Sequence, residues 1–177
     1  MRRWGSPRKI MIDAILLAVF PLLMAFAASS DLITMRLSNT LAAAIVGLFC
    51  VVALVLALPL EHILASLGGA TIVLVVGFAF FAFGWIGGGD AKFAAATALW
   101  IGLPGLLPYF VYAALLGGAL TLTLLAVRRW PLPAPLAQVK WIDRLHDNKS
   151  GVPYGIALAA AAILTYPGTN IYQLLLA

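Results

Sequence analysis

The chain has 177 residues, of which 64% are hydrophobic and only 10% are charged. Soluble domains carry about a quarter charged residues, so this composition excludes a water-soluble globular domain and indicates a membrane protein. The formal net charge is +5, but the basic residues lie in short polar gaps between apolar runs, a pattern that reflects membrane orientation and excludes nucleic acid as the expected partner.

Six apolar segments follow one another, at 10–29, 41–60, 68–86, 91–107, 108–127 and 152–175. A membrane-spanning helix needs about 20 apolar residues, with a range of about 17–25. The first three and the last two segments fit, whereas 91–107 is short and carries Pro104 near its end. The sequence predicts an all-α, polytopic membrane protein with about six transmembrane helices in one domain over 1–177. The fourth segment is expected either to tilt little or to form a tight hairpin with the fifth through Leu103-Pro104-Gly105.

The first segment also has features of a secretory signal, because four basic residues precede it and it ends in Ala27-Ala28-Ser29-Ser30. The apolar region of such a signal is typically about 7–15 residues long. This segment is longer, which favours a retained spanning helix over a cleaved signal. A true start at Met11 is a further alternative.

If the helices alternate in direction, the gaps at 30–40, 87–92 and 128–151 share one side of the membrane. The gap on the other side, with Glu61-His62, holds no Lys or Arg. The positive-inside rule then makes 128–151 a cytoplasmic loop, and the basic N-terminal tail breaks the rule unless Met11 is the start. Seven basic residues lie in the three gaps: Arg36, Lys92, Arg128, Arg129, Lys140, Arg144 and Lys149.

The long loop has two expected features. Its prolines, Pro131, Pro133 and Pro135, predict an extended first part, because proline fixes φ and blocks helix formation. Its basic residues Arg128, Arg129 and Lys140 are expected to contact anionic lipid head groups.

Asp31 and Asp90 each lie at the edge of an apolar segment and on the same predicted face. Acidic residues at membrane segments are costly and usually face a protein interior or a water-filled cavity. Two carboxylates close together at such a boundary share a proton, so one can take a proton from water while the other donates to a carbonyl. The structural alternative is that Asp31 caps a helix or pairs with Arg36, and that Asp90 pairs with Lys92.

Gly87, Gly88 and Gly89 directly precede Asp90. Glycine permits positive φ and the close approach of another backbone, and bare backbone offers an extended peptide substrate an edge to pair with. The alternative is a flexible turn between two helices.

Other chemistries lack their motifs. The sequence has no His-Glu-x-x-His, Gly-x-Ser-x-Gly or Gly-x-x-x-x-Gly-Lys-Ser/Thr. Its two histidines, His62 and His146, are predicted on opposite faces, and its single cysteine, Cys50, excludes a disulfide framework. Neither a metal nor an organic cofactor is expected.

Three stretches resemble motifs of the type IV prepilin peptidases. Gly87-Gly88-Gly89-Asp90-Ala91-Lys92 resembles their Gly-x-Gly-Asp-x-Lys signature, and Ser30-Asp31 followed by Arg36-Leu37-Ser38-Asn39 resembles their first aspartate motif. The stretch 152–159 resembles the Pro-Tyr-Gly start of their last helix. The order, spacing and short length are most similar to the small prepilin peptidases of tight-adherence (Flp) pilus systems, the CpaA/TadV group.

The resemblance implies an aspartic endopeptidase of the bacterial inner membrane that removes the basic leader from prepilins or pseudopilins at the cytoplasmic face. Asp31 and Asp90 would be the catalytic pair, with Gly87, Gly88, Gly89, Lys92 and Asn39 as motif or substrate-binding residues. Ser38 departs from the proline that members usually place before the asparagine. Larger members carry paired cysteines linked to methylation, and nothing similar is present here, so methyltransferase activity is not expected.

Three other functions are compatible with parts of the sequence. The presenilin and signal-peptide-peptidase group shares the Gly-x-Gly-Asp motif, but its members are larger and place Tyr where this chain has Ser30. A small transporter or channel subunit could use interfacial carboxylates, although such carboxylates should lie in the middle of the bilayer. A structural membrane subunit without catalysis is the third.

Overall fold

The computed structural model describes residues 7–176, and within this range every regular element is a helix. The chain is therefore all-α. The elements in chain order are α1 (Pro7–Thr34), α2 (Asn39–Val55), α3 (Leu60–Ala82), α4 (Gly88–Ile101), η1 (Leu103–Gly105), α5 (Leu106–Val127), α6 (Ala134–Ala137), α7 (Lys140–His146), α8 (Tyr154–Thr165), η2 (Tyr166–Gly168) and α9 (Asn170–Leu176).

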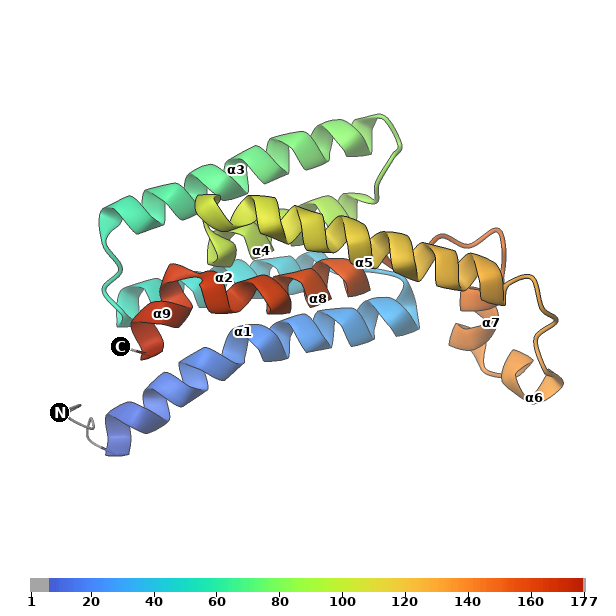
Figure 1. Ribbon diagram of the computed structural model, residues 1–177, viewed down its shortest axis with the longest axis horizontal. Helices are drawn as coiled ribbons and strands as arrows, with labels where there is room; N and C mark the ends of the chain where they lie inside the picture. Colours follow the sequence, from blue (N-terminus) through green and yellow to red (C-terminus); the bar gives the residue numbers. More distant parts are fainter. Residues whose placement is uncertain (1–6, 177) are drawn as a thin grey trace.

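Two alanine-rich helices, α4 and α8, form the centre of the bundle. Helix α4 packs against α2, α3 and α8, while α8 also packs against α1 and α5. Figure 1 shows α1 and α3 on opposite outer sides, with the other long helices between them. Small side chains let neighbouring helices approach closely. In α4, ten of the residues between Ala91 and Ile101 are buried, as expected of a helix that has protein on every side.

The face of α3 that packs against α4 and η1 carries mostly small side chains spaced three or four residues apart. Ser66, Gly69, Val73 and Gly77 are the buried residues of α3. A Cβ added at Gly77 would lie 3.1 Å from the Cβ of Ala91. The rest of α3 exposes large apolar side chains, such as Phe78 and Val75, which suits a helix with one face on protein and the remainder on lipid.

Three helical stretches are long and apolar enough to cross a membrane: Arg8–Thr34, Leu60–Ala82 and Leu103–Val127. Two shorter apolar stretches, Asn39–Val55 and Tyr154–Gly168, accompany them. The polytopic fold is confirmed, but six full spans are not. The fourth predicted segment became α4, which has only 14 residues, because Gly102 turns the backbone at φ 71° and η1 then leads into α5. The predicted hairpin at Leu103–Gly105 is confirmed.

The last predicted segment, 152–175, is not one continuous helix. It is divided into α8, the 3₁₀ turn Tyr166–Gly168 and α9. Pro167 lies in that turn, and proline has no backbone N–H with which to continue an α-helix. In the loop before α8, the stretch from Pro131 to Pro133 is not helical, and Pro133 has an extended backbone at φ −56° and ψ 139°. Pro135, in contrast, lies in the first turn of α6, a position that tolerates proline.

The three basic gaps lie at the same end of the molecule. The α1–α2, α3–α4 and α5–α8 connections all lie on the right of Figure 1, whereas the α2–α3 connection lies on the left. This agrees with the predicted alternation of helix direction. Of the basic tail, Arg8 and Lys9 belong to α1, while Arg2 and Arg3 lie outside the described residues.

Candidate active site

Asp31 lies in the last turn of α1 and is almost completely buried, with 3% of its surface exposed. The backbone N–H of Gly155 donates to its Oδ2 at 2.8 Å, and the N–H of Ile156 also bonds to this carboxylate. Both N–H groups belong to the first turn of α8, where the helix has free donors and a positive dipole end. Asp31 therefore caps a helix, as the structural alternative required, but the helix is α8 and not its own.

The chain reverses direction at the end of α1, shortly after Asp31. The N–H of Met35 donates to the carbonyl of Asp31 at 2.7 Å, and Met35 has φ 51°, a left-handed conformation that ends the helix. Such a conformation is uncommon for a residue other than glycine and is often found at functional sites. Ser38 then caps α2 by accepting from the N–H of Leu41 at 3.1 Å, so the serine that departs from the family pattern has a structural role.

Asp90 occupies the third position of α4, where Gly87 is the residue before the first helical one. The N–H of Gly87 bonds to its carboxylate, as the acidic residue of a capping box does. Asp90 lies outside the three candidate spans. Burial, together with repulsion from Asp31, raises the pKa of Asp90 to about 6. The two carboxylates are therefore close enough to influence each other's ionisation.

Leu37 lies between the segments that carry the two aspartates. A Cβ added at Gly155 would lie 2.8 Å from the Cδ1 of Leu37 and 2.7 Å from the Oδ2 of Asp31. A Cβ added at Gly89 would lie 3.0 Å from the carbonyl oxygen of Leu37. Both glycines are therefore needed for close approach, because a side chain at either position would displace the turn that follows Asp31.

The three glycines before Asp90 match one expectation and differ from another. Close approach of another backbone is found at Gly89. Positive φ is not, because the described glycines with positive φ are Gly84 and Gly102. Gly88 and Gly89 are the first two residues of α4, so their backbone is helical and offers no extended edge to a peptide. Gly87 alone has an extended backbone, at φ −72° and ψ 143°.

Lys92 and Asn39 are brought together, although 53 residues separate them. The Nζ of Lys92 donates to the Oδ1 of Asn39 at 3.0 Å, which ties α4 to the start of α2. Within residues 7–176, neither Arg36 with Asp31 nor Lys92 with Asp90 forms an ion pair, so the ion-pair part of the structural alternative is not supported.

Gly155 is the site residue that was absent from the predicted set. Its signal was present in the Pro-Tyr-Gly stretch, but the sequence alone could not show that this glycine contacts Asp31, which lies 124 residues earlier. Arg128 makes contacts that were not predicted. It donates to the carbonyls of Leu145, Ser150 and Gly151 at 2.9, 3.2 and 2.9 Å, so its guanidinium organises the loop before α8.

The fold and the site together define a helical membrane protein with two interacting carboxylates at one end of its bundle. Neither carboxylate lies in the middle of a long apolar helix, as a transport site would require. Asp31 is in the last turn of α1 and Asp90 in the first turn of α4. A pair of this kind can bind one shared proton and act on a water molecule as acid and base.

Comparison with known families agrees with this class. The model of the type IV leader peptidase family matches residues 18–122, more than half of the chain and a range that contains both Asp31 and Asp90. The chain therefore belongs to the type IV leader peptidase family and is a peptidase. No match was found among curated proteins or among solved structures.

Proposed function

We propose that the protein is an aspartic-type endopeptidase in which Asp31 and Asp90 form the catalytic pair. The observation that carries the proposal is the burial of Asp31 next to a second carboxylate whose pKa it raises, in a chain of a leader peptidase family. Paired carboxylates with a shared proton are the arrangement that aspartic peptidases use.

The proposed reaction is hydrolysis of one peptide bond. The ionised member of the pair removes a proton from a water molecule, and the water oxygen attacks the scissile carbonyl carbon. The protonated member donates to the carbonyl oxygen. Breakage of the C–N bond then gives a new carboxyl end on the leader and, after proton transfer to nitrogen, a new amine on the mature protein. The pair shares the proton, so neither role is fixed to one residue.

The proposed substrate is a prepilin or pseudopilin of the Flp type. Its apolar helix would lie beside the bundle in the bacterial inner membrane, with its basic leader in the cytoplasm. The junction between them would then meet the end of the bundle that carries Asp31 and Asp90. The short chain and the motif order favour the CpaA/TadV group within the family. In this arrangement Lys92 and Asn39 hold the Asp90 helix against the turn that follows Asp31.

Coexpression with an Flp-type prepilin tests the catalytic pair. Asp31→Asn and Asp90→Asn should each abolish leader removal, because an amide can neither hold nor release the shared proton. The asparagine side chain keeps an oxygen that can accept from the N–H of Gly155 or Gly87, so the fold should survive. Processing is measured by the mobility of the pilin on a gel, and the amount of each variant in the membrane fraction is measured by immunoblot.

Asp143→Asn is the matched control, because Asp143 is an exposed carboxylate of α7 at the same end of the molecule. It should process prepilin at the wild-type level. Processing that survives either Asp31→Asn or Asp90→Asn, with normal amounts in the membrane, would refute the pair. If the wild type removes the leader from another type IV prepilin but not from an Flp-type prepilin, the substrate class alone is refuted.

A further inference from the structure

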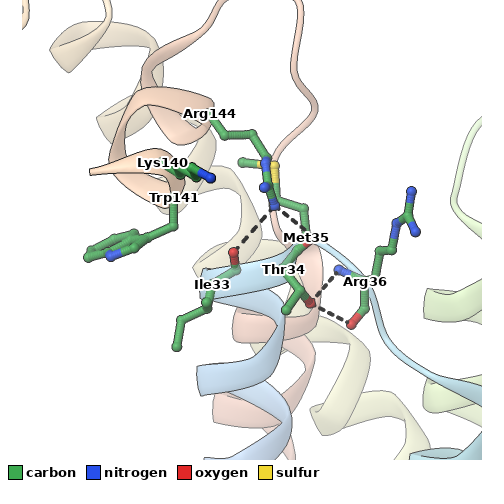
Figure 2. A pocket seen from close by; sticks show the side chains of 7 residues that line it. All are labelled: Ile33, Thr34, Met35, Arg36, Lys140, Trp141 and Arg144. Carbon is green, nitrogen blue, oxygen red and sulfur yellow. Dashed lines mark hydrogen bonds between the residues drawn. The ribbon is translucent and has the colours of Figure 1, made fainter. Parts of the chain in front are cut away.

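A cationic cavity of about 800 Å³ lies beside the C-terminal end of α1. Its walls come from the last turn of α1, the turn that follows it, and α7 (Figure 2). Three of the lining residues carry a positive charge, Arg36, Lys140 and Arg144, and no carboxylate lines the cavity. This volume lies within the range of small-molecule sites. The catalytic pair proposed above does not use it.

Arg144 fixes one wall of the cavity. Its Nη1 donates to the carbonyls of Ile33 at 3.4 Å and Thr34 at 3.2 Å. These are the last two carbonyls of α1, which lack partners within the helix and lie at the negative end of its dipole. Figure 2 shows the Arg144 side chain reaching from α7 to this helix end. A guanidinium has five N–H donors, so donors remain for a ligand.

Arg36 and Lys140 lie near Arg144 without acidic partners. Both side chains are exposed, and neither forms an ion pair with a residue in the described range 7–176. The backbone N–H of Arg36 donates to the Oγ1 of Thr34 at 3.2 Å, which fixes the turn from which its side chain projects. Three cations around one cavity, with no carboxylate in its walls, attract an anion and repel a basic peptide.

The position of the cavity relative to the bilayer indicates which anion it binds. Thr34 is the last residue of the candidate span Arg8–Thr34 and also lines the cavity. Because the cavity adjoins the end of a candidate span, we expect it to lie where the hydrocarbon ends and the phosphate groups of the lipids begin. Ile33, which is exposed, offers apolar surface on the hydrocarbon side. Trp141 also lines the cavity, and tryptophan is enriched at this level of membrane proteins.

We propose that the cavity binds the phosphate-bearing head group of an anionic phospholipid. The phosphate oxygens would accept hydrogen bonds from Arg36, Lys140 and Arg144, because guanidinium groups bind phosphate with paired N–H donors and lysine adds a point charge. The acyl chains would run along α1 past Ile33. A bound lipid would join α7 to the end of α1, one turn beyond Asp31. The site does not depend on the peptidase mechanism.

The test is native mass spectrometry of the full-length protein purified in detergent and titrated with phosphatidylglycerol or phosphatidylcholine. The wild-type protein should retain phosphatidylglycerol at least about tenfold more tightly than phosphatidylcholine. The variant Arg36→Gln/Lys140→Gln should lose most of this preference, by about tenfold, because basic residues near the membrane surface each contribute substantially to binding of anionic lipid. The control Arg129→Gln/Lys149→Gln removes two exposed charges that do not line the cavity.

The outcomes of this experiment distinguish a specific lipid site from the alternatives. The control variant should retain the wild-type preference within about twofold, because only general surface charge is lost. Equal losses in the two double variants would mean diffuse attraction and would overturn a specific cavity. Equal retention of the two lipids by the wild type would overturn anion recognition. A third arm adds inorganic phosphate, and displacement of phosphatidylglycerol by millimolar phosphate would identify a free-phosphate site and overturn the lipid assignment.

The comparison requires that the variants fold. Circular dichroism and gel filtration measure whether they do. If Arg36→Gln/Lys140→Gln does not fold, the single variants Arg36→Gln and Lys140→Gln replace it, with a weakening of about threefold expected for each. Arg144 is left unchanged throughout, because its hydrogen bonds to α1 also hold the structure together. Wild-type lipid preference in both folded single variants would overturn the proposal.

Discussion

The Asp31 carboxylate is held by backbone groups of α8, so a small change in that helix reaches it directly. Gly155 both donates to Oδ2 and leaves the space in which the carboxylate lies. The motif stretch around Gly155 could be recognised from the sequence. Its contact with Asp31 could not, because the contact joins two helices whose packing depends on the whole bundle.

Gly155→Ala should move Asp31. The new Cβ would lie 2.7 Å from Oδ2 and 2.9 Å from Cγ of Asp31, closer than a methyl group can approach. We expect leader removal to fall at least about tenfold and the free energy of unfolding to fall by about 1–3 kcal/mol, as in overpacked interiors. Prepilin processing and thermal unfolding in detergent measure the two effects.

Gly118→Ala is the control for this change, because a Cβ at Gly118 would meet nothing within 4 Å and the residue lies inside α5. It should leave processing unchanged. If Gly155→Ala processes prepilin as well as Gly118→Ala does, Asp31 is not positioned by α8.

At the scale of elements, the positions of the helices could be predicted from the sequence, but whether a helix is surrounded by lipid or by protein could not. The apolar segments located all the long helices, and the Leu103–Gly105 hairpin was correct. Apolar side chains are equally suited to lipid and to a protein core, however, so the pattern did not reveal that α4 is surrounded by protein. The alanines from Ala94 to Ala98 are informative only once the close packing of α4 is known.

The hydrogen bond from Lys92 to Asn39 is one of the contacts that link α4 to the start of α2. In a double-mutant cycle with Lys92→Ala and Asn39→Ala, the two losses of unfolding free energy should not add. The coupling should be about 0.5–1.5 kcal/mol, nearer the lower value because the pair is exposed. Thermal unfolding of the four forms gives the coupling.

A second cycle with Thr40→Ala in place of Asn39→Ala is the control. Thr40 is an exposed neighbour in the first turn of α2, and its change should add to that of Lys92→Ala. Additive losses in the Asn39 cycle as well would mean that the hydrogen bond does not stabilise the protein.

At the scale of the whole molecule, the positions of the basic connections and the alternating directions of the helices predict the same orientation in the membrane. The alternation of helices was predictable from the order of apolar segments, and the three basic connections do lie at one end (Figure 1). The sequence could not give the number of complete spans, because the lengths of α4 and α8 depend on where Gly102 and the turn containing Pro167 end them.

Thiol labelling should show this orientation in a Cys50→Ser background. A cysteine at Lys149 should react with a membrane-impermeant reagent only from the cytoplasmic side, and a cysteine at Glu61 only from the opposite side. Both residues are exposed. The Cys50→Ser parent should remain unlabelled. Labelling of both positions from one side would contradict the alternation, and the reverse pattern would contradict the cytoplasmic placement of the 128–151 loop.

The coupling of the two aspartates is measured most directly by infrared titration of the Asp90 carboxyl in the purified protein. The signal is assigned by its loss in Asp90→Asn. In the wild type the Asp90 carboxyl should lose its proton at about pH 6, so between about pH 4 and pH 6 it stays protonated where an ordinary aspartic acid has ionised. In Asp31→Asn, where the repelling charge is gone, the pKa of Asp90 should fall toward its ordinary value while burial keeps part of the increase. An Asp90 pKa that is the same in both proteins would contradict a coupled pair.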